Sequence, residues 1–326
     1  MTNAVKRAQL AGLVALALSA AIVGCCGTAA RTYQSSARPA VETVRVKLPA
    51  GAADVDIYWP DTVEPAPLMI VAHGFSRQRH NMSGWGRHLA EEGFVAVVPD
   101  LPAWSDQVRN GRFITELRAY LRAGGSWKQR IDPSRVGLMG FSAGGLACLL
   151  SAADDPGLAI WVGLDPVDRN GIGAKAAPLV TCRAVVLTAE PSACNSQGNA
   201  RGIVAALPRG EHFAIAGAVH VDAEWPTDWM AEAVCGRSTD KKRGEFRLRA
   251  ITALREALSV PAVDSLPALI EERRDRDAQP GAASPSSTEA AATSAESFAS
   301  ARITLSSGPG SSRVASWLGS RAAGMK

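Results

Sequence analysis

The chain has few of the residues from which metal and nucleotide sites are built. Its 326 residues include only five histidines, which are scattered and form no His-Glu-x-x-His pattern. Paired Cys-x-x-Cys motifs and an aspartate-rich calcium loop are also absent from the sequence, as are a Gly-x-Gly-x-x-Gly fingerprint and a Gly-Lys-Ser/Thr phosphate loop. We therefore expect the protein to use no metal ion and no other cofactor.

The chain also lacks a large excess of either positive or negative charge. The chain carries 35 lysines and arginines against 31 aspartates and glutamates, a net charge of +4, and it has no basic stripe with interleaved aromatic residues. A nucleic acid is therefore not an expected partner.

The N-terminal residues have the pattern of an export signal. Lys6 and Arg7 precede an apolar run over residues 10–24 that is too short to span a bilayer comfortably. The run ends Ile-Val-Gly-Cys, which is similar to a bacterial lipobox with Cys25 as the lipidated residue, although Cys26 follows directly. We expect residues 1–25 to be a signal peptide of the lipoprotein type; ordinary cleaved export and an uncleaved anchor are the alternatives. The mature domain is then expected outside the cytoplasm, with the lipid anchor as its membrane contact.

Short apolar runs alternate with helical patterns along most of the chain. Strands are expected at residues 44–48, 55–58, 67–72, 94–98, 136–139, 159–164, 184–187 and 213–216. Helices are expected at residues 83–92, 113–123, 143–150, 200–206, 227–234 and 243–258. This order predicts an α/β fold, with a mostly parallel, roughly eight-stranded sheet and helices on both faces.

The domain is expected to span residues 43–265. A polar tether over residues 26–42 precedes it. Residues 266–326 follow it as a low-complexity tail rich in Ala, Ser, Pro and Thr, which has too few bulky apolar residues to order itself.

Residues 136–145, Val-Gly-Leu-Met-Gly-Phe-Ser-Ala-Gly-Gly, are the most informative segment. Gly140, Ser142 and Gly144 fit the Gly-x-Ser-x-Gly nucleophile elbow, between an expected strand and an expected helix. Small neighbours let strand and helix approach closely, and the helix N-terminus favours developing negative charge. We take Ser142 to be a nucleophile; the alternative is a glycine-rich turn with an inert serine.

The partners of such a serine are found by elimination among the histidines. His220 follows the last expected strand and lies downstream of Ser142 and of every acid considered, which gives the chain order nucleophile, acid, base. His73 ends an expected strand, and the segment His-Gly-Phe resembles an oxyanion loop, so we expect the N–H groups of Phe75 and Ala143 to bind an oxyanion. The alternative for His73 is a strand-end turn. The remaining histidines are expected at the surface: His80, His88 and His212.

Three carboxylates qualify as the acid that orients the base. Asp165 ends an apolar strand, where a side chain faces the crevice in which ligands bind to α/β sheets, and Asp168 follows in the loop. Glu190 ends the next strand, which is the commoner position for such an acid in this fold.

Five stretches carry a resemblance to a known family: Ala72–Phe75, Gly140–Gly145, Gly163–Asp168, Ser192–Asn195 and Gly217–Asp222. With these, residues 41 to 237 resemble the chlorophyllase-like branch of the α/β hydrolases, which is related to platelet-activating-factor acetylhydrolases and bacterial polyester hydrolases. The resemblance implies that the aspartate of the Asp-Pro-Val segment, Asp165, is the acid. Phe141 and Ala143 stand where chlorophyllases often carry His and Arg, so chlorophyll is not implied as substrate.

Four aromatic residues are expected in loops near these groups, where they would form an apolar pocket: Phe75, Trp85, Trp104 and Trp225. Ordinary packing is the alternative for each. Residues 101–112 are the only sizeable insertion expected near the site, and no lid domain is expected.

Two cysteines, Cys194 and Cys235, follow late strands, and we expect them to form a disulfide, although spacing alone does not fix the pairing. Taken together, the sequence predicts a serine carboxylic-ester hydrolase, of the carboxylesterase or lipase kind, that acts on a small ester with an apolar part through an acyl-enzyme. An amide or peptide hydrolase with the same triad, and a non-catalytic envelope binding protein with the same fold, are the alternatives.

Overall fold

The structure is a computed structural model that describes residues 38–124 and 127–260. The predicted signal peptide with Cys25, most of the tether and the predicted tail lie outside these residues. Within the described part of the chain, no helix is long and apolar enough to cross a membrane.

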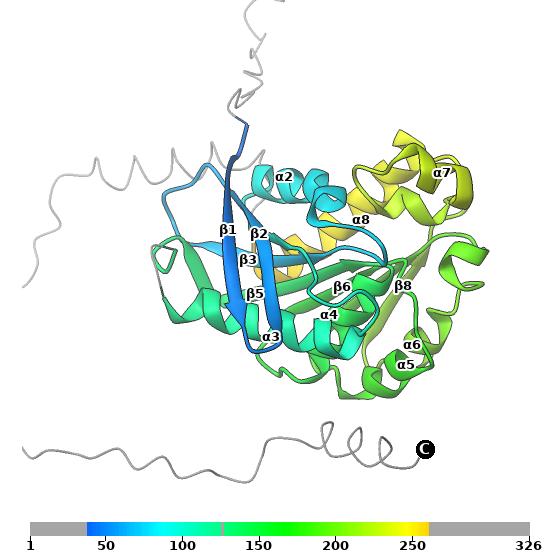
Figure 1. The fold of residues 1–326 in the computed structure, drawn as a ribbon, viewed down its shortest axis with the longest axis horizontal. Helices are drawn as coiled ribbons and strands as arrows, with labels where there is room; N and C mark the ends of the chain where they lie inside the picture. The colour runs from blue at the N-terminus through cyan, green and yellow to red at the C-terminus, as the bar shows by residue number, and fades with distance from the viewer. Residues whose placement is uncertain (1–37, 125–126, 261–326) are drawn as a thin grey trace, which may run out of the picture. The chain divides into compact units, whose positions relative to one another are not determined.

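Eight strands form a single sheet in the order β1-β2-β4-β3-β5-β6-β7-β8 (Figure 1). Strand β2 is antiparallel to both β1 and β4, and all other neighbouring strands are parallel. The strands are β1 (Ala40–Leu48), β2 (Gly51–Trp59), β3 (Ala66–Ala72), β4 (Val95–Pro99), β5 (Ile131–Phe141), β6 (Ile160–Leu164), β7 (Arg183–Thr188) and β8 (Gly210–Ala214). The predicted eight-stranded, mostly parallel sheet is confirmed.

Helices cover both faces of the sheet, as predicted (Figure 1). Residues of α3 (Gln107–Ala123), α4 (Ala143–Ala153) and α6 (Arg201–Ala206) belong to the core on one face, and residues of α2 (Ser83–Glu91) and α8 (Asp240–Leu258) to the core on the other. The shorter elements are α5 (Ile172–Ala176), α7 (Trp229–Cys235) and the 3-10 helices η1 (Arg79–Met82), η2 (Ala177–Leu179), η3 (Ala193–Asn195) and η4 (His220–Ala223).

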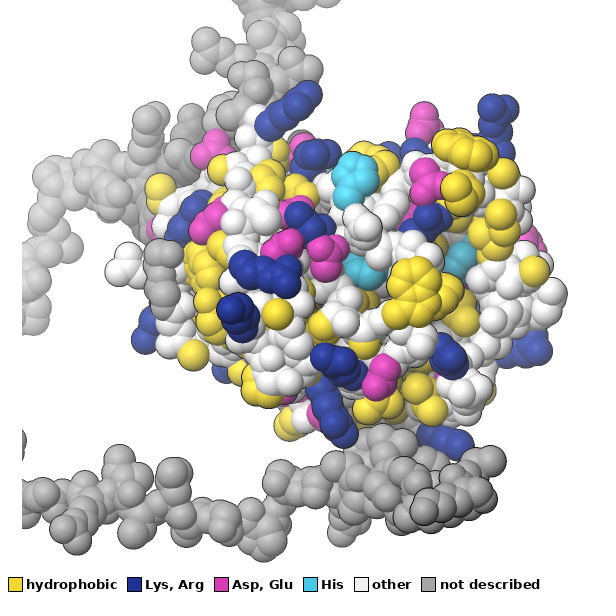
Figure 2. Space-filling view, viewed as in Figure 1, with side chains coloured by type: hydrophobic (Ala, Val, Ile, Leu, Met, Phe, Trp, Pro, Cys, Tyr) yellow, Lys and Arg dark blue, Asp and Glu magenta, His cyan; other side chains and the backbone are white. Residues whose placement is uncertain are grey.

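The apolar run of β3 explains why the sheet is covered on both faces. Leu68 and Ile70 point into the core beside α3 and α4, whereas Met69 and Val71 point into the core beside α2 and α8. Because side chains alternate along a strand, a strand buried on both faces must be apolar throughout. Basic and acidic side chains are interspersed on the face that Figure 2 displays.

Several element boundaries differ from the expectations. Helix α3 begins at Gln107 rather than at residue 113, because the Asp106 carboxylate accepts a hydrogen bond from the Arg109 N–H and caps the helix. The second half of the expected insertion over residues 101–112 is therefore helix. Strand β8 begins at Gly210 rather than at residue 213, strand β1 begins inside the expected tether, and α5 was not predicted.

The sheet has a topological switch point between β3 and β5. From β3 the chain continues to β4 on one side, and from β4 it crosses to β5 on the other side of β3. In parallel sheets the crevice for ligands opens at the carboxyl ends of the two strands that flank such a point. These ends lead into His73 and into Ser142.

Candidate active site

Ser142 occupies a sharp turn between β5 and α4. Its backbone angles are φ 54° and ψ −122°, which few residues other than glycine adopt. The Ser142 N–H donates to the carbonyl of Leu164 (3.0 Å), and its own carbonyl accepts from the N–H of Val167 (3.2 Å). The turn is therefore held against the end of β6, and it keeps the side chain at the crevice.

The glycines around Ser142 are required by close backbone contacts. A Cβ atom on Gly144 would overlap the carbonyl oxygens of His73 and Ala72, and one on Gly140 would overlap the backbone of Gly144. The elbow pattern in the sequence thus reflects a strand and a helix that touch through their main chains.

Ser142, His220 and Asp165 form a continuous hydrogen-bonded chain. His220 Nε2 lies 3.0 Å from Ser142 Oγ, and His220 Nδ1 lies 2.6 Å from Asp165 Oδ2. An ionised carboxylate only accepts hydrogen bonds, so Nδ1 carries the hydrogen and Nε2 accepts from the serine hydroxyl. All three side chains are buried, and in this arrangement the imidazole can take a proton from the serine.

Asp165 differs from the two other acid candidates in its contacts. Its Oδ1 accepts from the N–H of Ala189 (3.1 Å), which fixes the carboxylate toward His220. Asp168 instead caps α5 by accepting from the N–H of Gly173 (2.7 Å) and of Ala174 (3.0 Å). Glu190 is exposed.

Glu190 Oε1 accepts from the N–H of Gly217 (2.9 Å), so this side chain closes a turn. Among the three candidates, Asp165 is the one that contacts the His220 ring.

Asn195 supports the Asp165 carboxylate, a role that was not predicted from the sequence. Its Nδ2 donates to Asp165 Oδ2 (3.0 Å) and to the carbonyl of Glu190 (2.9 Å), and its Oδ1 accepts from the N–H of Ser192 (2.8 Å) and of Gly198 (3.0 Å). Asn195 is 1% exposed, so its full set of hydrogen bonds holds η3 and the acid together.

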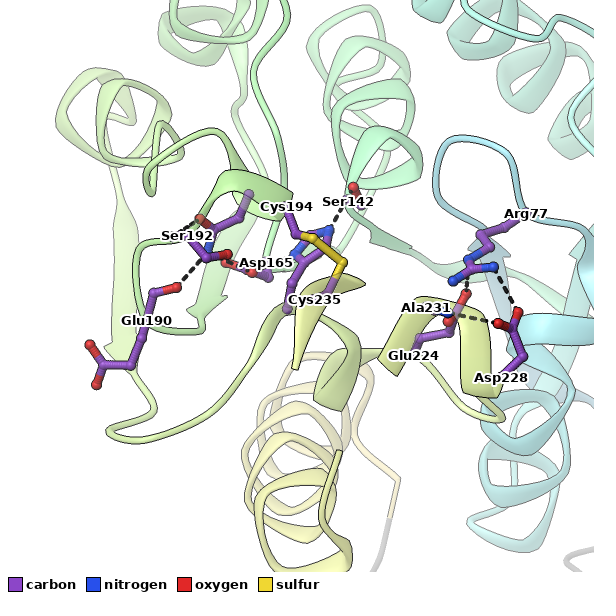
Figure 3. The surroundings of a disulfide bond; sticks show 12 residues. Arg77, Ser142, Asp165, Glu190, Ser192, Cys194, Glu224, Asp228, Ala231 and Cys235 are labelled. Carbon is purple, nitrogen blue, oxygen red and sulfur yellow. Dashed lines mark hydrogen bonds and ion pairs between the residues drawn. A yellow bond between two sulfur atoms is a disulfide. The ribbon is translucent and has the colours of Figure 1, made fainter. Parts of the chain in front are cut away.

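A disulfide joins Cys194, next to Asn195, to Cys235 at the end of α7 (Figure 3). The pair is the one that the sequence suggested. The bond connects the loop that supports Asp165 with the helix that follows the His220 segment.

His73, at the end of β3, makes two hydrogen bonds to backbone groups. Its Nδ1–H donates to the carbonyl of Gly74 (2.9 Å), and its Nε2 accepts from the N–H of Leu101 (2.9 Å). Burial lowers the pKa of His73, which favours the neutral ring that this pattern requires. His73 thereby ties the end of β3 to the loop after β4.

A cavity of about 280 Å³ opens between these two loops. Phe75 and Ala143, the expected oxyanion donors, both line it, together with Trp104. Phe75 and Trp104 make an edge-to-face contact with ring centroids 5.1 Å apart, and both are exposed. Two of the four aromatic residues expected in a pocket are therefore placed there.

The other two aromatic residues are not. Trp85 lies in α2, fully buried, and its indole N–H donates to the carbonyl of Ala223 (2.9 Å). Trp225 packs against Gly84 and beneath the guanidinium of Arg247, 4.5 Å from the ring centroid. Both expectations were wrong because these residues face the core beside α2 and α8, away from the cavity.

A buried ion pair connects the loop after β3 with the segment after η4. Glu224 follows η4, its side chain is completely buried, and its Oε1 lies 2.9 Å from Arg77 Nε (Figure 3). Burial raises the pKa of Glu224 to about 7, and the positive charge of Arg77 opposes this shift. Arg77 also pairs with Asp228 (2.8 Å) and lines the cavity. The sequence interpretation did not single out this cluster.

The described residues contain no group of three or more His, Cys, Asp or Glu side chains that could hold a metal ion. The expectation that the protein uses no cofactor stays a prediction.

Curated relatives match only part of the chain. A bis(hydroxyethyl) terephthalate hydrolase from Streptomyces coelicolor is 32% identical over 113 residues, which cover 34% of this chain and 36% of the relative. A cutinase, est1, from Thermobifida alba is 28% identical over 117 residues, which cover 35% of this chain and 40% of the relative. The chain thus spans less than half of the length of these relatives.

Solved structures share the fold. A dienelactone hydrolase-like promiscuous phosphotriesterase from metagenomic libraries superimposes with a TM-score of 0.54 at 15% identity, covering 68% of this chain and 99% of that protein. The likeness supports the α/β-hydrolase fold. A family model described as PETase, PET hydrolase-like, matches residues 19–223. The chain belongs to the PET hydrolase-like family of the α/β hydrolases.

Proposed function

We propose that the protein is a serine hydrolase of carboxylic esters. Ser142 is the nucleophile, His220 the general base and Asp165 the residue that orients His220. The observation that carries the proposal is the chain of hydrogen bonds from Ser142 Oγ through His220 to Asp165, at 3.0 and 2.6 Å. The names of the relatives, a terephthalate ester hydrolase and a cutinase, support an ester as the substrate.

In the proposed cycle, Ser142 Oγ attacks the ester carbonyl while His220 Nε2 takes its proton. The N–H groups of Phe75 and Ala143 bind the oxyanion, and His220 then gives the proton to the leaving alcohol. Water attacks the resulting acyl-enzyme with His220 again as base, which releases the acid and restores the serine. Asp165 stabilises the charged imidazole in both halves of the cycle.

The nucleophile is tested with Ser142→Ala. We expect turnover of p-nitrophenyl butanoate to fall by about 10⁵-fold, and labelling by a fluorophosphonate to disappear. Ser134→Ala is the control, because Ser134 is exposed near the other end of the same strand. Wild-type turnover by Ser142→Ala would refute the mechanism, and absent labelling of the wild type would favour a binding protein. Matched butanoate esters and anilides distinguish ester from amide hydrolysis.

We also propose that the enzyme acts after export, anchored by a lipid on Cys25. The lipobox-like segment that ends at Cys25 supports this, and the disulfide suits an oxidising compartment. Metabolic labelling with palmitate in a bacterial host should mark the wild type and spare Cys25→Ser; equal labelling of both would contradict the anchor.

A further inference from the structure

The cavity that Ala143 lines is bordered by both apolar and polar residues. Phe75, Leu101, Pro102 and Trp104 contribute apolar surface, and Gln107 lies in the lining although its side chain is almost buried, at 5% exposure. Polar groups that are withdrawn from water normally have hydrogen-bond partners, because an unsatisfied donor or acceptor is costly. The partners of Gln107 therefore indicate what the cavity is built to hold.

The orientation of two amide groups follows from fixed backbone atoms. The N–H of Ala103 donates to Asn110 Oδ1 (3.0 Å), and Asn110 Nδ2 donates to the carbonyl of Ala103 (2.9 Å). These two bonds define which side-chain atom of Asn110 is nitrogen. Asn110 Nδ2 also donates to Gln107 Oε1 (3.3 Å), so the oxygen of Gln107 faces Asn110 and its NH₂ group points elsewhere.

The NH₂ group of Gln107 is a donor without a protein partner, and it is not among the fully buried unpaired atoms of the described residues, so it reaches solvent. Within residues 38–124 and 127–260, no group accepts a hydrogen bond from Gln107 Nε2, and Gln107 lines the cavity. An oxygen atom of a bound molecule would complete its hydrogen bonding.

The position of His220 indicates which part of an ester enters this cavity. His220 must face the leaving oxygen, because it gives that oxygen a proton, and His220 is not among the described residues that line the cavity. The N–H groups assigned to the oxyanion, on Phe75 and Ala143, do line it. The leaving alcohol therefore lies toward His220, and the acyl group lies in the cavity.

We propose that Gln107 determines acyl specificity by donating a hydrogen bond from Nε2 to a second oxygen in the acyl group. The preferred substrates are esters whose acyl part carries an ether, keto, hydroxyl or further ester oxygen within a few bonds of the reacting carbonyl. The inference rests on the proposed ester hydrolysis, and it names the acyl class that the site selects.

The test compares ester pairs that differ only by an oxygen in place of a methylene group: p-nitrophenyl methoxyacetate with butanoate, and 3-methoxypropanoate with pentanoate. For each enzyme, kcat/KM of the ether is divided by kcat/KM of the alkyl ester. Intrinsic reactivity cancels when this ratio is compared between enzymes, so a change in the ratio reports on the contact with the added oxygen.

Two variants separate donation from packing. Gln107→Leu removes the amide, and Gln107→Glu keeps an oxygen acceptor for Asn110 while it removes the donor. We expect the ratio to fall about 5-fold to 10-fold in both variants for at least one pair. Gln129→Leu, an exposed glutamine on a loop, is the control and should leave the ratio unchanged.

The possible failures are distinguishable. If both variants hydrolyse the alkyl and ether esters with the wild-type ratio, Gln107 does not read the acyl oxygen, although ester hydrolysis itself is upheld. An equal loss on both members of each pair would mean a structural role and would also overturn the inference. If the wild type hydrolyses none of the four esters, both the proposed function and this inference fail.

Discussion

The disulfide between Cys194 and Cys235 should contribute a large part of the stability of the described domain. The two residues are separated by 41 positions in the sequence. A cross-link that closes a loop of this length lowers the entropy of the unfolded chain enough to stabilise the fold by about 4 kcal/mol. For a domain of this size, the corresponding decrease in Tm is about 8–16 °C.

Replacing both cysteines by serine tests this estimate. We expect urea unfolding of the double variant to show a loss of about 4 kcal/mol and, because Asn195 is adjacent to Cys194, a lower kcat with p-nitrophenyl butanoate. Cys182→Ala is the control, because Cys182 is buried but free. Dithiothreitol should destabilise the wild type and leave the double variant unchanged. Mass spectrometry should first show that the disulfide is intact in the wild type. If the unfolding free energy of the double variant then lies within about 1 kcal/mol of the wild-type value, the reasoning is refuted.

Three further predictions concern single residues. Gly144→Ala should abolish esterase activity and lower the unfolding free energy by about 2 kcal/mol or more, because the new Cβ would overlap the carbonyl of His73. Gly202→Ala is the control, because its Cβ would meet its nearest neighbour at 3.6 Å. Circular dichroism and thermal melting should show that this control folds normally. Asn195→Ala should lower kcat by about 10-fold or more with little change in KM, because the Asp165 carboxylate loses a donor that holds it toward the base, and steady-state kinetics would measure this. The pKa of Glu224 is raised from 4.5 to about 7, so the folded state binds this proton more tightly than the unfolded chain does. The unfolding free energy should therefore fall as the pH rises from 4.5 to about 7 and level off above that. Glu224→Gln should flatten that dependence, with a gain of up to about 3 kcal/mol at pH 8 in urea unfolding.

Each of these predictions has a contradicting result. An active Gly144→Ala enzyme would mean that strand and helix can separate at the elbow. Unchanged kcat in Asn195→Ala would show that the contacts from Ala189 and His220 alone hold the acid. If the wild type and Glu224→Gln lose stability in parallel between pH 5 and 7, another group titrates in that window.

Local sequence patterns were sufficient for the central part of the fold. The buried run of β3 and the elbow at Ser142 are readable because a strand covered on both faces must be apolar and a strained turn needs glycines beside it. Parallel strands present their carboxyl ends at one edge, so His220 and the three candidate acids could be expected near Ser142. Strand ends alone did not choose among the acids; the family resemblance singled out Asp165, which contacts His220 in the structure.

Properties that depend on tertiary contacts were not readable. The segment before residue 113 is polar, so it resembled a loop, and only its packing shows that Gln107 is a buried helical residue. Trp85 was expected in the pocket as a loop residue, whereas it lies in α2 and is fully buried in the core. The role of Asn195 depends on the path of η3 relative to β6, which no local pattern encodes.

The switch point between β3 and β5 separates two parts of the sheet that contribute different residues to the candidate site. The proposed nucleophile, its orienting acid and its base follow β5, β6 and β8, whereas the residues that line the cavity come mostly from the loops after β3 and β4 and from the start of α3. If the proposed acyl site is correct, mutations in the segment from Leu101 to Gln107 should change which acyl groups are accepted, while Ser142, His220 and Asp165 keep their positions. Substrate specificity could then evolve, or be engineered, in this half of the sheet without substitutions at the proposed catalytic residues.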